Sequence, residues 1–188
     1  MKTLSIVLVA VLLVGAGVVQ AQNARIGPHA GYVIGPELEA EGESVELDDA
    51  FSYGVQLTHQ ANEALGIEIS GNRFSTEYDE LPDSDFSITS VAATIRLGGS
   101  PDQTTFIYGG GGVSYNFIEL EVFNVDLDPD DDIGYHFCGG VELALSDTVD
   151  FFAEYRQSYV TFDVPGFIED VEIDYEGGML RAGVSFAL

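Results

Sequence analysis

Charged side chains inside strand-like segments are the residues of this sequence whose types and spacing carry most chemistry. When the apolar residues of each segment are assigned to one face, four arginines and four carboxylates fall on the opposite face. They are Arg25, Arg96, Arg156, Arg181, Glu68, Glu142, Asp150 and Glu154. This equality is unusual in a chain with 32 acidic and 6 basic residues. Because charges that lose hydration need partners, the balance predicts a buried network of ion pairs.

Two pairs in this set are expected to lie on neighbouring strands, Glu68 with Arg96 and Glu154 with Arg181. Counted from the short connections, Arg25, Arg96, Glu68, Glu142 and Asp150 fall near that rim, and Glu154, Arg156 and Arg181 fall nearer mid-depth. Our hypothesis is that the pairs plug the interior. The alternative for each is a solvated ion pair worth ~0–1 kcal/mol.

A second candidate site is the acidic segment that contains Asp126, Asp128, Asp130 and Asp132. Alternate carboxylates suit Ca²⁺, which takes about six to eight oxygen ligands. The segment resembles the start of an EF-hand loop, but the glycine and the distant glutamate of that motif are not at the required spacing. Three other interpretations remain open: a solvated loop, Ca²⁺ or Mg²⁺ bridges to anionic lipid headgroups, and adaptation to high salt. No further cofactor is expected.

Catalysis is not predicted. The three histidines are His29 and His136, expected to face the interior, and His59, where a strand meets a short connection. No histidine is paired with a serine in the manner of the small barrel enzymes that modify lipid A. A histidine with polar partners can still act as an acid or base, so an enzyme remains the minor alternative. The acidic excess excludes nucleic acid as a partner.

The elements that must position these residues are eight strand-like segments. Their expected first residues are Asn23, Phe51, Leu65, Phe86, Thr104, Ile133, Val149 and Gly177. Long and short connections alternate between them, and the long ones contain 25 of the 32 acidic residues. This alternation predicts an all-β fold, an eight-stranded antiparallel up-and-down barrel with one elaborated, strongly acidic rim. Two strands have unclear faces, at residues 88–91 and at the glycine run 109–112, and a β-bulge fits either place.

The first 21 residues have the pattern of a cleaved signal peptide: Lys2, an apolar run and a small-residue site ending at Ala21. We therefore expect residues 22–188 to form the barrel domain. A soluble, lipocalin-like barrel would also alternate, but with its apolar face inward. Because the balanced charges lie on the polar face, an eight-stranded transmembrane barrel explains them better, with that face lining the interior.

The last eight residues resemble the assembly signal of small bacterial outer-membrane barrels of the OmpA transmembrane-domain and OmpX type. The matching positions are Arg181, Gly183, Phe186 and Leu188, although the family usually ends in an aromatic residue. The resemblance implies a Gram-negative outer membrane, contact with outer-membrane lipid and insertion by the barrel assembly machinery. It leaves two functions open, a structural or surface-interaction role and a narrow porin-like channel for small solutes.

Overall fold

The computed structural model describes residues 23–40, 42–77, 85–102, 104–122, 125–127, 129, 131–164 and 171–188. The predicted signal peptide lies outside these ranges and stays a prediction. Within the described ranges, no helix is long and apolar enough to cross a membrane.

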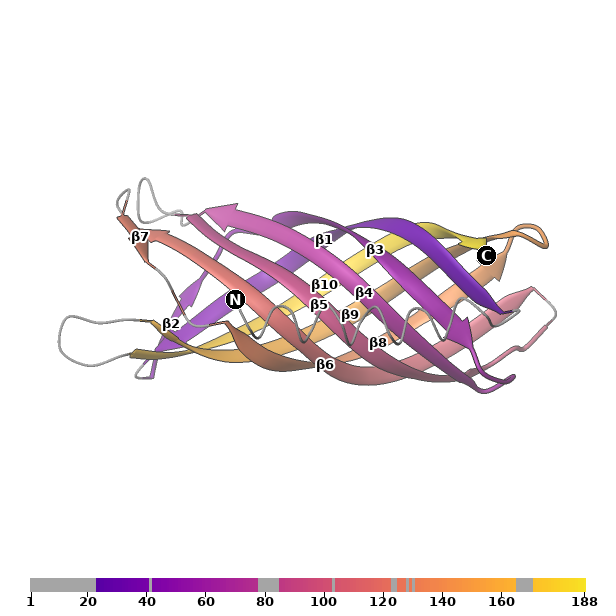
Figure 1. Ribbon diagram of the computed structural model, residues 1–188. Coiled ribbons are helices and arrows are strands. Elements are labelled where there is room, and N and C mark those ends of the chain that lie inside the picture. Colours follow the sequence, from indigo (N-terminus) through magenta and orange to yellow (C-terminus); the bar gives the residue numbers. More distant parts are fainter. Residues whose placement is uncertain are drawn as a thin grey trace.

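Ten strands make up the fold (Figure 1). They are β1 (Ala24–Ala40), β2 (Glu43–Glu46), β3 (Ala50–Gln60), β4 (Leu65–Glu77), β5 (Asp85–Gly99), β6 (Thr105–Val122), β7 (Val125–Leu127), β8 (Asp132–Ala144), β9 (Val149–Val164) and β10 (Val171–Ala187). Eight of them form one antiparallel sheet in the order β10-β9-β8-β6-β5-β4-β3-β1, and β10 pairs with β1 to close it. The predicted eight-stranded up-and-down barrel is confirmed.

The two short strands, β2 and β7, extend the wall at the end that carries the long connections. β2 pairs with the end of β1, and β7 pairs with the end of β6. Figure 1 shows both at the end of the barrel opposite the C-terminus. Several strands also run further toward this end than expected, since β1 continues to Ala40 and β10 already begins at Val171. Many acidic residues assigned to loops, including Glu37 and Asp174, therefore lie on paired strands.

The interior of the barrel changes character along its length. In the half near the short connections, the short-turn half, most inward side chains are polar or charged, such as Gln56, Glu68 and Arg181, although Phe152 is also buried there. In the other half, the long-loop half, fourteen buried residues form one apolar cluster. Its members are Val33, Leu38, Leu47, Ala50, Phe74, Phe86, Ile88, Ile118, Leu120, Val160, Phe162, Val164, Tyr175 and Met179. This apolar cluster was not predicted from the sequence.

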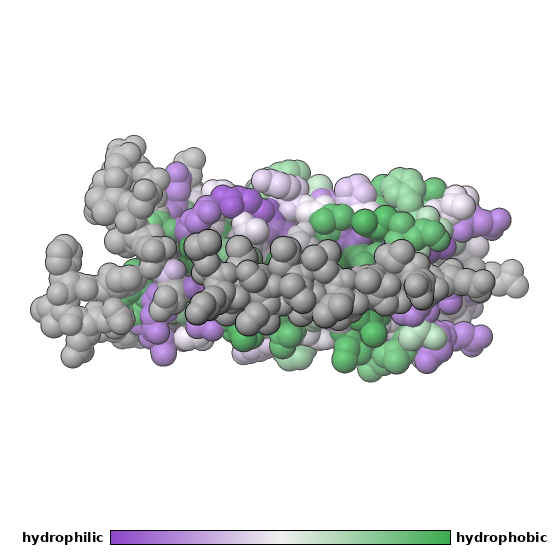
Figure 2. Space-filling view, in the orientation of Figure 1, coloured by the Kyte–Doolittle hydropathy of each residue, from purple (hydrophilic) through white to green (hydrophobic). Residues whose placement is uncertain are grey.

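The outer surface changes in the opposite sense. Large exposed apolar residues such as Ile95, Leu97 and Phe137 lie on the wall of the short-turn half. On the face seen in Figure 2, hydrophobic residues gather in the half that holds the C-terminus, with hydrophilic residues at its tip and in the opposite half. The short-turn half is thus apolar outside and polar inside, and the long-loop half is the reverse.

This reversal explains the unclear face of β5. Phe86, Ile88, Thr94 and Arg96 all point inward, in one unbroken phase, and the pairing with β4 and β6 is continuous. There is no bulge at residues 88–91. The apolar residues change sides there because the surroundings of the strand change, while its geometry does not.

The glycine run of β6 does not hold a bulge either. Pairing with β5 and β8 continues through residues 109–112. A Cβ atom on Gly112 would lie 2.0 Å from the carbonyl oxygen of Ala93, so this position needs glycine for close strand packing. The register shift lies instead between β1 and β10, at Ile34 and Glu37, where Gly35 has a φ of 53°.

Candidate functional site

Three strands bring four central charges together inside the short-turn half. Glu68 comes from β4, Glu154 and Arg156 from β9, and Arg181 from β10. Each points inward because of the two-residue alternation of its strand. Their side chains are between 0% and 5% exposed, so they are removed from bulk water.

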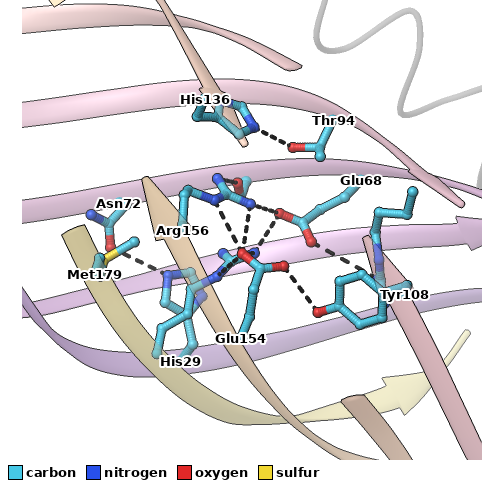
Figure 3. Close-up of polar contacts among 12 residues, drawn as sticks. His29, Glu68, Asn72, Thr94, Tyr108, His136, Glu154, Arg156 and Met179 are labelled. Carbon is cyan, nitrogen blue, oxygen red and sulfur yellow. Dashed lines mark hydrogen bonds and ion pairs between the residues drawn. The ribbon is translucent and has the colours of Figure 1, made fainter. Parts of the chain in front are cut away.

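These four residues form a closed set of ion pairs (Figure 3). The Arg156 and Arg181 guanidinium groups each donate to Glu68 Oε1 at 2.7 Å. Arg181 also contacts Glu154 Oε1 at 2.7 Å, and Arg156 contacts the same oxygen at 3.1 Å. Two guanidinium groups thus share two carboxylates, the arrangement that compensates buried charges best.

Arg96 connects this group to the short-turn end. Its guanidinium lies 2.5 Å from Glu142 and stacks over the Tyr108 ring, with 3.6 Å between Cζ and the ring centroid. The Tyr108 hydroxyl donates to Glu154 Oε2 at 2.9 Å. Tyr108 therefore joins the two parts of the network by a hydrogen bond and a cation–π contact.

The last pair, Arg25 with Asp150 at 2.8 Å, lies at the rim. Both residues line an open vestibule of about 1150 Å³ that includes the short turns. All eight predicted charges therefore have an opposite partner within 4.0 Å.

Of the two ion pairs predicted from the sequence, only one joins residues that are each other's main partners. Glu154 and Arg181 are in direct contact, but Glu68 lies 3.9 Å from Arg96 and much closer to Arg156 and Arg181. Glu68 is therefore at the level of the mid-depth arginines, and its placement near the rim is wrong. Counting residues from a turn ignores the tilt of barrel strands, which brings different counts to one height.

Further polar residues surround the network on the side of the apolar cluster. The Thr94 hydroxyl and His136 Nε2 are 2.8 Å apart, and His29 Nε2 lies 3.3 Å from Asn72 Oδ1. Two cavities of about 30 and 40 Å³ lie at this level, where Met179 lines both. Each has room for only one or a few water molecules. The two histidines were predicted to face the interior. Tyr108, Thr94 and Asn72 were not predicted, although the same alternation indicates them.

The apolar cluster occupies the interior above these cavities. The ring of Phe86 packs against those of Phe74, Phe162 and Tyr175, with centroids between 5.9 and 6.4 Å apart. Phe86 is 0% exposed. These aromatic side chains therefore pack closely at one level of the barrel.

The outer wall of the long-loop half contains a separate ion pair. Arg73 lies 2.7 Å from Glu119, and the Ser87 hydroxyl donates to the same carboxylate at 2.9 Å. These hydrogen bonds hold the pKa of the Glu119 carboxyl below its usual range. Arg73 is thus the one arginine used on the outside of the barrel.

The predicted cation site lies mostly outside the described residues. The positions of Asp128 and Asp130 and the side chain of Asp126 are not described, and Asp132 Oδ1 accepts a hydrogen bond from the Ile133 N–H at 2.6 Å. Among the side chains that are described, no three His, Cys, Asp or Glu groups are arranged to hold a metal ion.

The residues of the predicted assembly signal lie on both sides of the barrel wall. Arg181 points inward into the network, and a Cβ atom on Gly183 would clash with the Phe152 ring at 2.8 Å. Phe186 and Leu188 are exposed on the outside, and the Leu188 N–H donates to the Ala24 carbonyl at 3.0 Å.

Comparison with known proteins agrees with this architecture. Neisserial surface protein A is similar to the chain with a TM-score of 0.62 and 20% identity, over 88% of this chain and 97% of that one. OprG from Pseudomonas aeruginosa gives a TM-score of 0.66 and 13% identity, over 89% and 96%. The outer membrane protein AlkL gives 0.63 and 13%, over 89% and 91%. These identities support a shared fold alone, and no curated protein sequence matches the chain.

The family model for the outer membrane protein beta-barrel domain matches residues 6–187. That span contains all ten strands and the whole charge network. The apolar outer wall around a charge-filled interior is the arrangement that a lipid bilayer requires of a narrow barrel. The chain therefore belongs to the outer membrane protein beta-barrel domain family and is an integral protein of the Gram-negative outer membrane.

Proposed function

We propose that this protein is a non-conducting barrel that acts at the cell surface through its acidic long-loop half. One observation carries the proposal: two successive layers fill the interior, the ion-pair network and the apolar cluster. A solute that enters the vestibule meets the Arg96–Glu142 and Arg181–Glu154 pairs first. It then meets the aromatic side chains around Phe86.

The competing function is a narrow channel for small solutes, which the acidic rim would supply with cations. Recording from single barrels in a planar bilayer separates the two. We expect the wild type to show no steady conductance. Steady, large conductance in the wild type would overturn the proposal in favour of the channel, and uptake of small solutes by vesicles should then rise as well.

A double variant tests whether the ion-pair network keeps the interior closed when the apolar cluster is opened. Phe86→Ala with Phe162→Ala opens space only in the apolar cluster, where both side chains are at most 1% exposed. We expect this variant to remain closed because the ion pairs stay in place. Phe137→Ala is the matched control, since this ring lies on the outer wall and is 60% exposed.

The carboxylates on the outer wall of the long-loop half, the acidic wall, favour certain classes of partner. Membrane barrels place their long loops outside the cell, so the carboxylates face the headgroup layer and the medium. Suitable partners are outer-membrane lipid, divalent cations that bridge to its phosphates, and basic surfaces; nucleic acid is not suitable. Flotation with lipid vesicles, with and without Mg²⁺, measures this interaction, and binding that is equally strong after chelation would contradict the cation bridge.

We also propose that Asp126, Asp128, Asp130 and Asp132 bind Ca²⁺ or Mg²⁺ weakly. Titration calorimetry of the wild type and of an Asp130→Asn, Asp132→Asn variant tests it. A heat signal of equal size in both proteins would remove the site.

We also propose that the last strand, through Arg181, Gly183, Phe186 and Leu188, is recognised by the barrel assembly machinery. The outward position of Phe186 leaves it available for recognition, whereas Arg181 has a second role in the interior. Phe186→Ala should therefore slow assembly while leaving the stability of the refolded barrel nearly unchanged. Heat-modifiable gel migration monitors both.

Catalysis is not part of the proposed function. The polar pair Thr94 and His136 lies inside the barrel, where both side chains are buried. Comparison of lipid A by mass spectrometry, with and without the protein, provides the test. A changed lipid A profile would establish an enzyme instead.

A further inference from the structure

We propose that the end of β1 together with β2 forms a flap whose closure over the apolar cluster depends on ionic strength. The flap consists of residues 36–40 and 43–47, and it packs beside β10. Its two faces act in opposite directions, since one is drawn inward by burial and the other is opened by charge repulsion.

The outer face of the flap aligns carboxylates directly opposite one another. Glu37 is paired with Glu46 on β2 and with Glu176 on β10, and Glu39 is paired with Asp174. Like charges at directly opposed positions of an antiparallel pair repel across about 4.5–5.5 Å and destabilise the pairing. These two rows contain no basic residue. The flap therefore carries a repulsion that the charge-balanced interior avoids.

A solvent-filled groove runs along these rows. It has a volume of about 300 Å³ and lies between the carboxylates and the stacked rings of Tyr135 and Tyr159. Mobile cations can approach the carboxylates through this groove and reduce the repulsion.

Near its base, the inner face of the flap is apolar and buried, whereas Val45, which is paired with Leu38, is 46% exposed. Leu38 and Leu47 are 6% and 5% exposed and belong to the apolar cluster, where Tyr175 of β10 also packs. The Leu47 N–H donates to the Pro36 carbonyl at 2.8 Å. Burial of these side chains supplies the force that holds the flap closed.

The base of the flap coincides with the register shift in the pairing of β1 with β10. The register shifts between Ile34 and Glu37, and Gly35 adopts a φ of 53°, a conformation that favours glycine. The Gly35 N–H is held by Asp49 Oδ1 at 2.9 Å. Because the ladder is interrupted there, the flap can open while the pairing from Arg25 to Ile34 stays intact.

Ionic strength sets the balance between these forces. The screening length is about 30 Å in 0.01 M salt and about 3 Å in 1 M salt, which is shorter than the separation of the paired carboxylates. The flap should therefore be closed in high salt and open more often in low salt. Its opening exposes Leu38, Leu47 and Tyr175 to water.

Hydrogen–deuterium exchange of the refolded full chain in a zwitterionic detergent tests the flap. Between about 1 M and about 0.01 M NaCl, we expect exchange in residues 36–47 and 171–176 to accelerate by roughly tenfold or more. Exchange of residues 150–156 of β9, which pair with β10 on the short-turn side of the register shift, should change little. Equal exchange of the flap at both salt concentrations would overturn the proposal.

Two matched variants identify the cause. Glu37→Gln with Glu176→Gln removes the central repulsion and should abolish most of the salt dependence. Glu63→Gln with Asp147→Asn changes the net charge equally at the short turns, and this control should keep the wild-type salt dependence. If both variants behave alike, net charge is responsible and the flap is excluded. A stronger effect of Mg²⁺ than of Na⁺ at equal ionic strength would also overturn screening as the mechanism, in favour of a specific metal site.

Discussion

The two halves of this barrel share the same strands but have opposite distributions of polar and apolar side chains. On β10, Asp174 and Glu176 point outward around the inward Tyr175, whereas a few residues later Ala182 points outward and Arg181 points inward. The backbone alternation continues unchanged through this reversal. Geometry therefore decides which residues share a face, and the surroundings decide which face is apolar.

The reversal also marks where the lipid ends. A row of carboxylates such as Glu37, Glu176 and Glu46 cannot lie against hydrocarbon without a large free-energy cost. The long-loop half is accordingly built like a water-soluble barrel, which hydrophobic burial stabilises. In the short-turn half, lipid covers the apolar wall, and matched ion pairs fill the interior.

Removing one buried carboxylate gives the largest expected effect. Glu68→Leu leaves Arg156 and Arg181 short of a partner in a site that is 0% exposed at Glu68, and we expect a loss of ~3–5 kcal/mol in the free energy of unfolding. Urea unfolding in lipid vesicles measures it. In the isosteric Glu68→Gln variant, which keeps hydrogen-bond acceptance, the loss should be smaller; equal losses would show that charge pairing is not the cause.

Phe86→Ala tests how much the apolar cluster contributes to the free energy of unfolding in the long-loop half. The ring is fully buried, so its removal should cost ~3–5 kcal/mol through lost burial and a cavity. If the halves are stabilised separately, hydrogen exchange should accelerate near Phe74 and Tyr175 and stay slow around Glu154. Uniform acceleration over the whole barrel would contradict separate stabilisation.

A pair of arginine substitutions on β10 compares the two outer walls directly. Ala182→Arg places a charge against lipid and should cost ~2–4 kcal/mol at mid-depth. Asp174→Arg, on the same face of the same strand, should change stability by less than about 1 kcal/mol, because the site is exposed to water and surrounded by carboxylates. Similar costs at the two positions would place the lipid boundary elsewhere.

These same residues show what the sequence could predict. Alternation and the spacing of connections were enough to predict eight strands and all eight interior charges. The partners of Glu68 could not be predicted, because they depend on strand tilt and on contacts across the interior. The apolar cluster is reflected in the sequence by the change of apolar face at Ile88. This change looks like an irregularity if each strand is assumed to have the same surroundings along its whole length.

The short turn at Asp102 gives the smallest expected effect and lies outside both interiors. Asp102 Oδ1 accepts hydrogen bonds from the Thr104 and Thr105 N–H groups at 2.8 and 2.7 Å. These hydrogen bonds lower the pKa of the Asp102 carboxyl below its usual range. A depressed pKa in the folded state means that the stabilisation is present above the unfolded pKa and is lost as the pH falls through the lower, folded value. Asp102→Asn should therefore remove a slight part of the acid sensitivity below about pH 4, measured as the urea midpoint against pH. The Arg73–Glu119 pair provides the matching test on the long-loop wall, since Glu119→Gln should remove a similar part there. An acid response that is unchanged in both variants would assign it to the buried pairs instead.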